Sequence, residues 1–324
     1  MTDIAVVGAG AFGTALATRL GLSGHAVRLW ALERDIADSI NRDHENPTYL
    51  PGVDLSPAIR ATADLEEATR QAEFVLLVCP AQYVRRVVTA LVGNLHPGTP
   101  IITCSKGLEL ETGALMTEVV GELIPEAPVA ALSGPTFAIE VAKGMRSRAA
   151  LGSADLALAR RLATAMSNTR FRAIPTIDVA GVQVGGAVKN VIAIACGMAQ
   201  ALGLGENARA VLMTAGVAEM TALARAKGGR AATVRGLSGL GDLALTCTSE
   251  RSRNTRFGIA IGSGRTVDEV LAEPWPAVTE GLHTAAAVHT LCHRFGLDLP
   301  VCRAVYAVLY EGADPRGAIE SLFA

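Results

Sequence analysis

Short apolar runs alternate with helical patterns through the first half of the chain. The runs are rich in Val, Ile and Leu, which is typical of strands that are covered on both faces. They occupy residues 4–7, 26–30, 74–79, 101–104, 129–132 and 149–151. Apolar residues recur at helical spacing between them, for example in 13–22 and 83–91. This alternation predicts an α/β fold with a doubly wound parallel sheet.

The pattern changes after about residue 180, where strand signals fade and Ala-rich helical runs dominate. The predicted helices lie at 182–201, 208–226, 267–271, 284–295 and 303–310. We therefore expect two domains, a sheet domain over 1–178 and an all-helical domain over 179–324, joined by a long helix. A length of 324 residues agrees with two domains.

Composition excludes several classes of protein. Half of the residues are hydrophobic, which excludes wholesale disorder. The net charge of −2 gives no reason to expect nucleic-acid or membrane-surface binding. We expect no apolar stretch to approach the 18 residues of a membrane span; the strongest, 191–199, is bracketed by Lys189 and Gln200. No signal peptide is recognisable at the N-terminus.

Six cysteines are spread along the chain without a CxxC pair or a zinc-site spacing. We interpret them as reduced thiols of a cytoplasmic protein, and we expect no metal. Three histidines, His283, His289 and His293, share one helical stretch and are interpreted as surface or packing residues.

A glycine loop follows the first predicted strand. Gly8, Gly10 and Gly13 form a GxGxxG pattern that opens a helix. In such loops the first glycine permits a tight turn, the second lets a pyrophosphate approach the backbone, and the third lets helix pack on strand. The free N–H groups at the helix start favour anions. The loop predicts dinucleotide binding.

The end of the second strand leaves NAD and NADP open. An acid at its tip would bond a ribose hydroxyl, and a cation there would hold a 2′-phosphate. The chain has Leu32, then Glu33 and Arg34 side by side. Arg34 would attract the 2′-phosphate of NADP and Glu33 would repel it. We expect these two effects to cancel in part, so that the two cofactors are weakly discriminated.

Lysine is scarce, with 4 Lys against 25 Arg. Lys189 lies in a helix that is apolar nearly all round, so we expect it to be buried. Burial lowers the pKa of a lysine and makes it a usable proton acceptor near neutral pH. Asp242 precedes a hydroxyl by four residues, on one helical face, and is a candidate partner for Lys189. An N-cap role for Asp242 remains open.

Further polar residues follow predicted strands or helices. Lys106 comes directly after the run 101–104, at the sheet edge where open α/β sheets bind ligands. The segment 133–138 stands in the same relation to the next strand. Ser252, Arg253 and Asn254 offer a hydroxyl, a forked cation and an amide, which together suit a phosphate. The alternative is a solvated loop for Lys106 and for 252–254, and an ordinary strand-to-helix turn for 133–138.

Eight sequence motifs, in this order along the chain, are typical of one protein family. They are GAGAFGTALA, NPTYLPG, SKGLE, SGPTFAIEVAKG, GVQVGGAVKNVIAIACG, GENARA, GLSGLGDLALTCTSERSRNTRFG and VTEG. With these motifs the chain resembles the bacterial NAD(P)-dependent glycerol-3-phosphate dehydrogenases, nearly end to end. The resemblance implies a Rossmann-type domain, a helical domain and a substrate cleft between them. It implies interconversion of dihydroxyacetone phosphate and sn-glycerol 3-phosphate for phospholipid synthesis, with NAD or NADP and no metal, in a cytoplasmic homodimer.

The resemblance also implies residue roles. Lys189 and Asp242 would be catalytic, with Lys189 as the proton acceptor. The substrate would contact Lys106, Gly134, Thr136, Lys189, Asp242, Ser252, Arg253 and Asn254. The dinucleotide would contact Gly8, Gly10, Ala11, Phe12, Gly13, Tyr49, Lys106, Ala138, Arg253, Val278 and Glu280.

The chain departs from the family pattern at Ala11, which lacks a hydroxyl common there, and at Leu32, where a basic residue is frequent. Two alternatives remain open at this point. One is another dehydrogenase of the same architecture, of the β-hydroxyacid or 6-phosphogluconate type. The other is a non-catalytic dinucleotide sensor.

Overall fold

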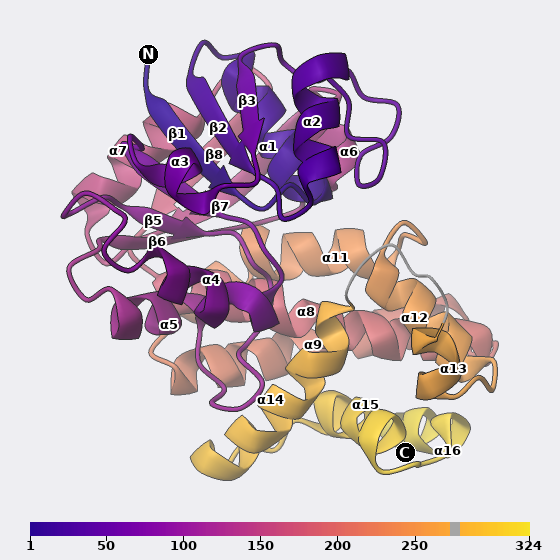
Figure 1. Cartoon of the computed structure of the whole chain (residues 1–324). Coiled ribbons are helices and arrows are strands. Elements are labelled where there is room, and N and C mark those ends of the chain that lie inside the picture. The colour runs from indigo at the N-terminus through magenta and orange to yellow at the C-terminus, as the bar shows by residue number, and fades with distance from the viewer. Residues whose placement is uncertain (273–278) are drawn as a thin grey trace. The chain divides into compact units, whose positions relative to one another are not determined.

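The structure is a computed structural model that describes residues 1–272 and 279–324 (Figure 1). It divides into two compact units. The first comprises Met1–Ser105, Met116–Leu132 and Thr136–Val179. The second comprises Lys106–Leu115, Ser133–Pro135 and Ala180–Ala324. Two short segments that follow strands of the sheet thus belong to the helical unit.

One sheet of eight strands organises the first unit, in the order β3-β2-β1-β4-β5-β6-β7-β8. The pairing is parallel from β3 through β6 and again between β7 and β8. The predicted doubly wound α/β fold with a helical second part is confirmed. The strands are β1 Asp3–Val7, β2 Ala26–Trp30, β3 Ile59–Thr62, β4 Phe74–Leu77, β5 Ile101–Thr103, β6 Val129–Ser133, β7 Ser147–Gly152 and β8 Phe171–Thr176.

The helices of the first unit pack around this sheet, and Val6, Leu29 and Leu76 lie fully buried in its core. The parallel strands are joined through these helices, as parallel pairing requires. They are α1 Ala11–Gly21, α2 Arg34–Asp43, α3 Leu65–Thr69, η1 Ala81–Tyr83, α4 Val84–Leu91, α5 Met116–Leu123, α6 Ala138–Ala142 and α7 Leu156–Met166.

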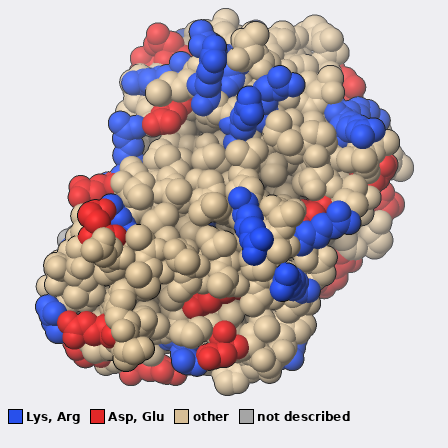
Figure 2. Space-filling view, turned by 180° about the vertical axis from the view of Figure 1, so that it is seen from behind, with Lys and Arg blue, Asp and Glu red and all other residues tan. Residues whose placement is uncertain are grey.

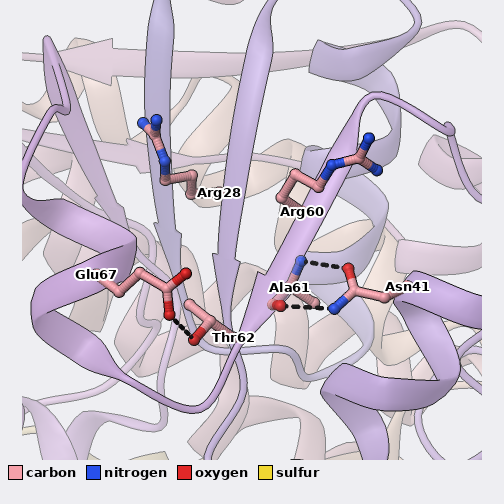
Figure 3. Close-up of a pocket in the computed structure, with 6 residues that line it drawn as sticks. All are labelled: Arg28, Asn41, Arg60, Ala61, Thr62 and Glu67. Carbon is pink, nitrogen blue, oxygen red and sulfur yellow. Dashed lines mark hydrogen bonds between the residues drawn. The ribbon is translucent and has the colours of Figure 1, made fainter.

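The two edge strands, β3 and β8, are the ones that the sequence pattern did not reveal. Arg60 in β3 and Arg172 in β8 are exposed, so neither strand is a continuous apolar run. Asn41 of α2 closes the outer edge of β3: its amide accepts from Ala61 N–H at 2.9 Å and donates to Ala61 C=O at 2.8 Å (Figure 3). This side chain satisfies backbone groups that an open edge would leave for another chain.

The described elements of the second unit that follow residue 179 are all helical (Figure 1). Their apolar faces form a separate core. They are α8 Val179–Ala201, α9 Gly205–Ala226, α10 Ala231–Val234, the π-helical turn η2 Leu237–Gly241, α11 Asp242–Cys247, α12 Arg253–Gly262, α13 Val267–Leu271, α14 Glu280–Phe295, α15 Pro300–Tyr310, α16 Pro315–Glu320 and η3 Ser321–Phe323.

Helix α8 corrects one sequence expectation. Its 23 residues are long and apolar enough, by length and composition alone, to cross a membrane. The apolar run 191–199 is only part of this helix, which extends from Val179 to Ala201 and contains Lys189. In the structure 89% of the apolar window is buried inside the protein, which is how a core helix behaves. Burial among its neighbours therefore accounts for the composition of α8.

Charged side chains of both signs are distributed over the face shown in Figure 2. Lys and Arg occur there singly or in small groups among uncharged residues, with Asp and Glu at the margins. This face therefore carries no continuous basic track.

A buried carboxylate anchors α15 to α9. Glu219 is 5% exposed, and its two oxygens accept hydrogen bonds from the backbone N–H groups of Val301 at 2.6 Å and Cys302 at 3.0 Å. These groups belong to the first turn of α15, whose N-cap Leu299 provides no side-chain acceptor. The carboxylate thus replaces the missing cap and complements the positive end of the helix.

We predict that Glu219→Ala lowers the free energy of unfolding by about 2–3 kcal/mol, because it leaves two buried N–H groups without acceptors. Chemical denaturation followed by circular dichroism measures this. The matched control is Glu320→Ala, which breaks an exposed ion pair with Arg316 and is expected to cost less than about 1 kcal/mol. Equal losses in the two variants would contradict the anchoring role.

Candidate active site

The glycine loop of the first unit has the geometry that the sequence predicted. Gly8 has φ +119°, and a Cβ there would lie 2.9 Å from the carbonyl oxygen of Val78. A Cβ on Gly13 would collide with the carbonyl of Gly8. At Gly10, by contrast, a Cβ would meet nothing within 4 Å. The first and third glycines are therefore required by packing, and the second keeps an approach to the backbone open.

Helix α1 begins directly behind this open position. Its N-cap is Gly10, which makes no side-chain cap. The first N–H groups of a helix lack intrahelical partners and attract anions. Ala11 and Phe12 pack partly against the core of the unit and contribute backbone here. This cradle fits the pyrophosphate of a dinucleotide.

Asn46 forms hydrogen bonds to the glycine loop and to the start of α1, and the sequence did not predict these contacts. Its amide donates to Ala9 C=O at 2.8 Å and to Thr14 Oγ1 at 2.9 Å, and its side chain is fully buried. Three residues on, Tyr49 donates its hydroxyl to Glu33 Oε1 at 2.9 Å. The NPTYLPG motif was the available signal, since it holds both residues.

A second cluster lies within the helical unit. Lys189, in the middle of α8, donates from Nζ to Asp242 Oδ1 and to Thr246 Oγ1, both at 2.7 Å. Thr246 in turn donates to the backbone carbonyl of Asp242 at 2.6 Å. The N-cap of α11 is Gly241, so Asp242 is the first residue of the helix and not its cap, and its carboxylate accepts from the lysine. The hydroxyl four residues after Asp242 shares its helical face, as expected from the sequence.

Lys106 completes the cluster from the other side of the carboxylate. Its Nζ donates to Asp242 Oδ2 at 2.7 Å and to Gly134 C=O at 2.9 Å. Each oxygen of one carboxylate thus binds a different lysine. Lys189 is 6% exposed and Asp242 is 1% exposed. Two ammonium groups around one buried carboxylate leave an excess positive charge, which favours an anion or the loss of one proton.

Burial decides which proton is lost. It lowers the pKa of Lys189 to about 8, against the opposing attraction of Asp242, and the charge of Lys106 lowers that pKa as well. A group with this pKa exchanges protons near neutral pH, as a general acid or base requires.

Close backbone packing sets this geometry. The turn η2 lies immediately before Asp242 and packs on α8 at Gly185, where a Cβ would lie 2.8 Å from the carbonyl oxygen of Ser238. Gly185 is one helical turn before Lys189. The missing side chain therefore lets the turn that carries Asp242 approach the helix that carries Lys189.

Two of the three residues in the segment 252–254 form hydrogen bonds within the protein. Ser252 Oγ caps α12 by accepting from Thr255 N–H at 3.2 Å. Asn254 donates to Asn190 Oδ1 at 2.9 Å and accepts from Gly281 N–H at 2.9 Å. Arg253, by contrast, is exposed at the first position of α12. Of the three, Arg253 is the one placed to meet a ligand.

The remaining predicted residues fall in different parts of the structure. Asn190 donates to Lys106 C=O at 2.9 Å, which ties the segment of Lys106 to α8. Thr136 is buried and Ala138 begins α6, both in the first unit. Glu280 begins α14. Val278 lies outside the described residues.

A shallow cavity of about 450 Å³ lies elsewhere in the first unit, over the edge formed by β2 and β3 (Figure 3). None of the predicted site residues lines it. It is lined by Arg28, Asn41, Arg60, Ala61, Thr62 and Glu67. Arg28 is paired with Asp3 and bonded to Gln71, so we assign this cavity no role.

Comparison with known proteins gives matches along nearly the whole chain. A family model described as NAD-dependent glycerol-3-phosphate dehydrogenase N-terminus matches residues 3–159, and the corresponding C-terminus model matches residues 178–320. Glycerol-3-phosphate dehydrogenase (NAD(P)+) of Rhodospirillum rubrum is 53% identical over 320 residues, 98% of this chain and 91% of that protein. The enzyme of the same name from Hyphomonas neptunium is 49% identical over 317 residues, 98% of this chain and 94% of that protein.

A solved structure gives the same result. The crystal structure of glycerol-3-phosphate dehydrogenase from Coxiella burnetii superposes with a TM-score of 0.95 at 36% identity. The match covers 99% of this chain and 98% of that one.

Proposed function

Because the chain belongs to the NAD-dependent glycerol-3-phosphate dehydrogenase family, we propose that it interconverts sn-glycerol 3-phosphate and dihydroxyacetone phosphate with Lys189 as the proton acceptor. The chain is an oxidoreductase that uses NAD or NADP. The observation that carries the assignment of Lys189 is its place beside Asp242 and Thr246 with a pKa lowered to about 8.

The contacts of Lys189 support its role as the proton acceptor. A neutral amine has two N–H donors and one lone pair. Asp242 Oδ1 and Thr246 Oγ1 accept the two donors, each at 2.7 Å. The lone pair is then available to the C2 hydroxyl of glycerol 3-phosphate, whose proton it accepts in oxidation. In reduction the third N–H of protonated Lys189 points to the carbonyl oxygen and stabilises its developing negative charge.

Lys106 keeps the shared carboxylate in place and adds a positive charge. Its contact to Gly134 C=O fixes the ammonium group beside the backbone that follows β6. We propose that Lys106, Gly134 and Thr136 contact the substrate, as the family resemblance implies. Asp242 orients both lysines through its two oxygens.

The dinucleotide supplies the hydride acceptor when it is bound. We propose that its pyrophosphate binds at the open face of Gly10 and the first N–H groups of α1. Ala138, Glu280 and Val278 are assigned to the cofactor on the family resemblance.

Tyr49 bears on the choice between NAD and NADP. Its hydroxyl engages Glu33, while Leu32 and Arg34 are exposed beside it. The hydrogen bond from Tyr49 holds the Glu33 carboxylate in place near the end of β2. Weak discrimination between the two cofactors stays our prediction.

The substrate phosphate is assigned to Arg253. The guanidinium of Arg253, at the start of α12, can bind a phosphate with two parallel hydrogen bonds. This contact is remote from the reacting carbon, so its binding energy orients that carbon. Ser252 and Asn254 support it by fixing the first turn of the helix.

The family assignment decides between the alternatives left open by the sequence. The relatives that are 53% and 49% identical to this chain are named glycerol-3-phosphate dehydrogenases. The sensor alternative would be supported by the loss of Lys189 or Asp242, and both are present. The product of the proposed reduction supplies phospholipid synthesis, so the enzyme belongs to lipid metabolism.

We also propose that the enzyme is a cytoplasmic homodimer. All six cysteines are free and five are buried, which suits a reducing compartment. Val211 and Ala218, two helical turns apart on α9, are exposed, and these apolar side chains support association of two copies.

We predict that Lys189→Met lowers kcat at least 100-fold, the usual size of general acid–base catalysis, while dinucleotide affinity survives. The assay is oxidation of NADH or NADPH with dihydroxyacetone phosphate, beside a fluorescence titration of cofactor. Lys143→Met, at an exposed position, is the matched control. Near-normal turnover of Lys189→Met would remove this lysine from the mechanism, and absence of activity in the unmodified enzyme would refute the function.

Arg253→Ala is expected to raise KM for glycerol 3-phosphate at least tenfold, because a charge-assisted bidentate contact is lost. Activity on glycerol, which has no phosphate, should change far less. Arg251→Ala, an exposed neighbour, serves as control. If both substrates lost activity by the same factor, Arg253 would have no role in phosphate binding.

The pH profile of alcohol oxidation tests the role of Asp242. Oxidation needs neutral Lys189, so its rate should fall tenfold per pH unit below about 8. In Asp242→Asn the attraction that favours protonated Lys189 is lost, so the pKa falls and the acid limb moves to lower pH. Asp298→Asn, at an exposed ion pair, should leave the profile unchanged. An acid limb that stays in place in Asp242→Asn would contradict this coupling.

A further inference from the structure

Two histidines on α14 form a close pair that the proposed reaction does not use. His289 and His293 are four residues apart, one helical turn, and their Nε2 atoms lie 3.1 Å from each other. The sequence predicts surface or packing residues here, but the HxxxH spacing of His289 and His293 brings their rings together. His289 is half-buried and His293 is exposed, so both rings can be reached from solvent.

The separation of the two nitrogens fits a shared metal ion. Imidazole nitrogens bind Zn²⁺ at about 2.0–2.1 Å, so two of them on one ion lie roughly 2.9 Å apart at a right angle and roughly 3.4 Å apart at a tetrahedral angle. The observed 3.1 Å falls between these values. The same two nitrogens are within hydrogen-bond distance of each other, so an ion bound by both would replace that hydrogen bond.

The pair is built into the packing of α14 against α15. The ring of His289 stacks on Tyr306, with centroids 3.7 Å apart and planes 7° from parallel. Tyr306 stacks on Tyr310 at 5.1 Å, and the Tyr310 hydroxyl donates to Leu282 C=O at 2.9 Å. One of the two ligands is therefore held in place before any ion binds, which lowers the entropic cost of binding.

We propose that His289 and His293 form a binding site for a divalent transition metal ion that favours imidazole, such as Ni²⁺, Cu²⁺ or Zn²⁺. Among the described residues, no three His, Cys, Asp or Glu side chains gather to hold a metal. Water therefore completes the coordination, and the ion is exchangeable. It would fix the last turns of α14 on the aromatic stack of α15, and it is not a cofactor of the reaction.

The test is a calorimetric titration of the full-length, untagged enzyme with Ni²⁺ alone. We expect one ion per chain. Either His289→Ala or His293→Ala should weaken the affinity at least about tenfold, because the second imidazole then no longer binds intramolecularly. The variants His283→Ala, on the same helix, and Cys292→Ser, next to His293, should change it less than twofold. Circular dichroism checks that each variant keeps its helices.

Three results would overturn the proposal. The first is no binding of Ni²⁺ to the unmodified enzyme. The second is binding that survives both His289→Ala and His293→Ala, or that is lost in Cys292→Ser. The third is one ion per two chains, which would place the site between copies. Because dehydrogenase activity does not enter this titration, its outcome is independent of the proposed function.

Discussion

One buried carboxylate, Asp242, holds two ammonium groups, and the chemistry of the helical unit depends on this arrangement. A carboxylate that is 1% exposed is stable only if its charge is matched. Lys189 and Lys106 each bind one of its oxygens at 2.7 Å. Two cations cannot both be fully neutralised by one anion, so the more deeply buried lysine has the lowered pKa. Burial, together with the charge of Lys106, thus makes Lys189 the proton acceptor, while Asp242 opposes this shift and holds the amine in place.

The fold supplies what this arrangement requires. Asp242 and Lys106 are 136 residues apart in the chain, and the segment Lys106–Leu115 belongs to the helical unit although it follows β5. Gly185 removes a side chain where the π-helical turn approaches α8. Such turns are frequent at functional sites because they displace the residues that follow them. Here the residue that follows is Asp242.

The sequence predicted the fold where strands are apolar throughout and failed where they are not. The central strands are covered on both faces, so their Val, Ile and Leu runs were visible. In the edge strands β3 and β8, buried residues alternate with exposed ones, so neither strand shows a continuous apolar run. Strand β8 also contains Pro175, which an edge strand tolerates. The pairing of Lys189 with Asp242 was within reach, because an apolar helix and a four-residue spacing are local patterns. Two other contacts join residues that are far apart in the chain, and no local pattern predicts them. They are the hydrogen bond from Lys106 to Asp242 and the one from Asn46 to the Ala9 carbonyl in the glycine loop.

The central claim is that Lys189 has a pKa near 8 in the resting enzyme. The chain has only 4 lysines, so nuclear magnetic resonance of lysine labelled at the side chain can follow each one through a pH titration. The account predicts one signal that titrates at about 8 and that is absent from the spectrum of Lys189→Met. If the Lys189 signal titrated at 10 or above, burial would not make this lysine a proton acceptor near neutral pH, and the account would be wrong.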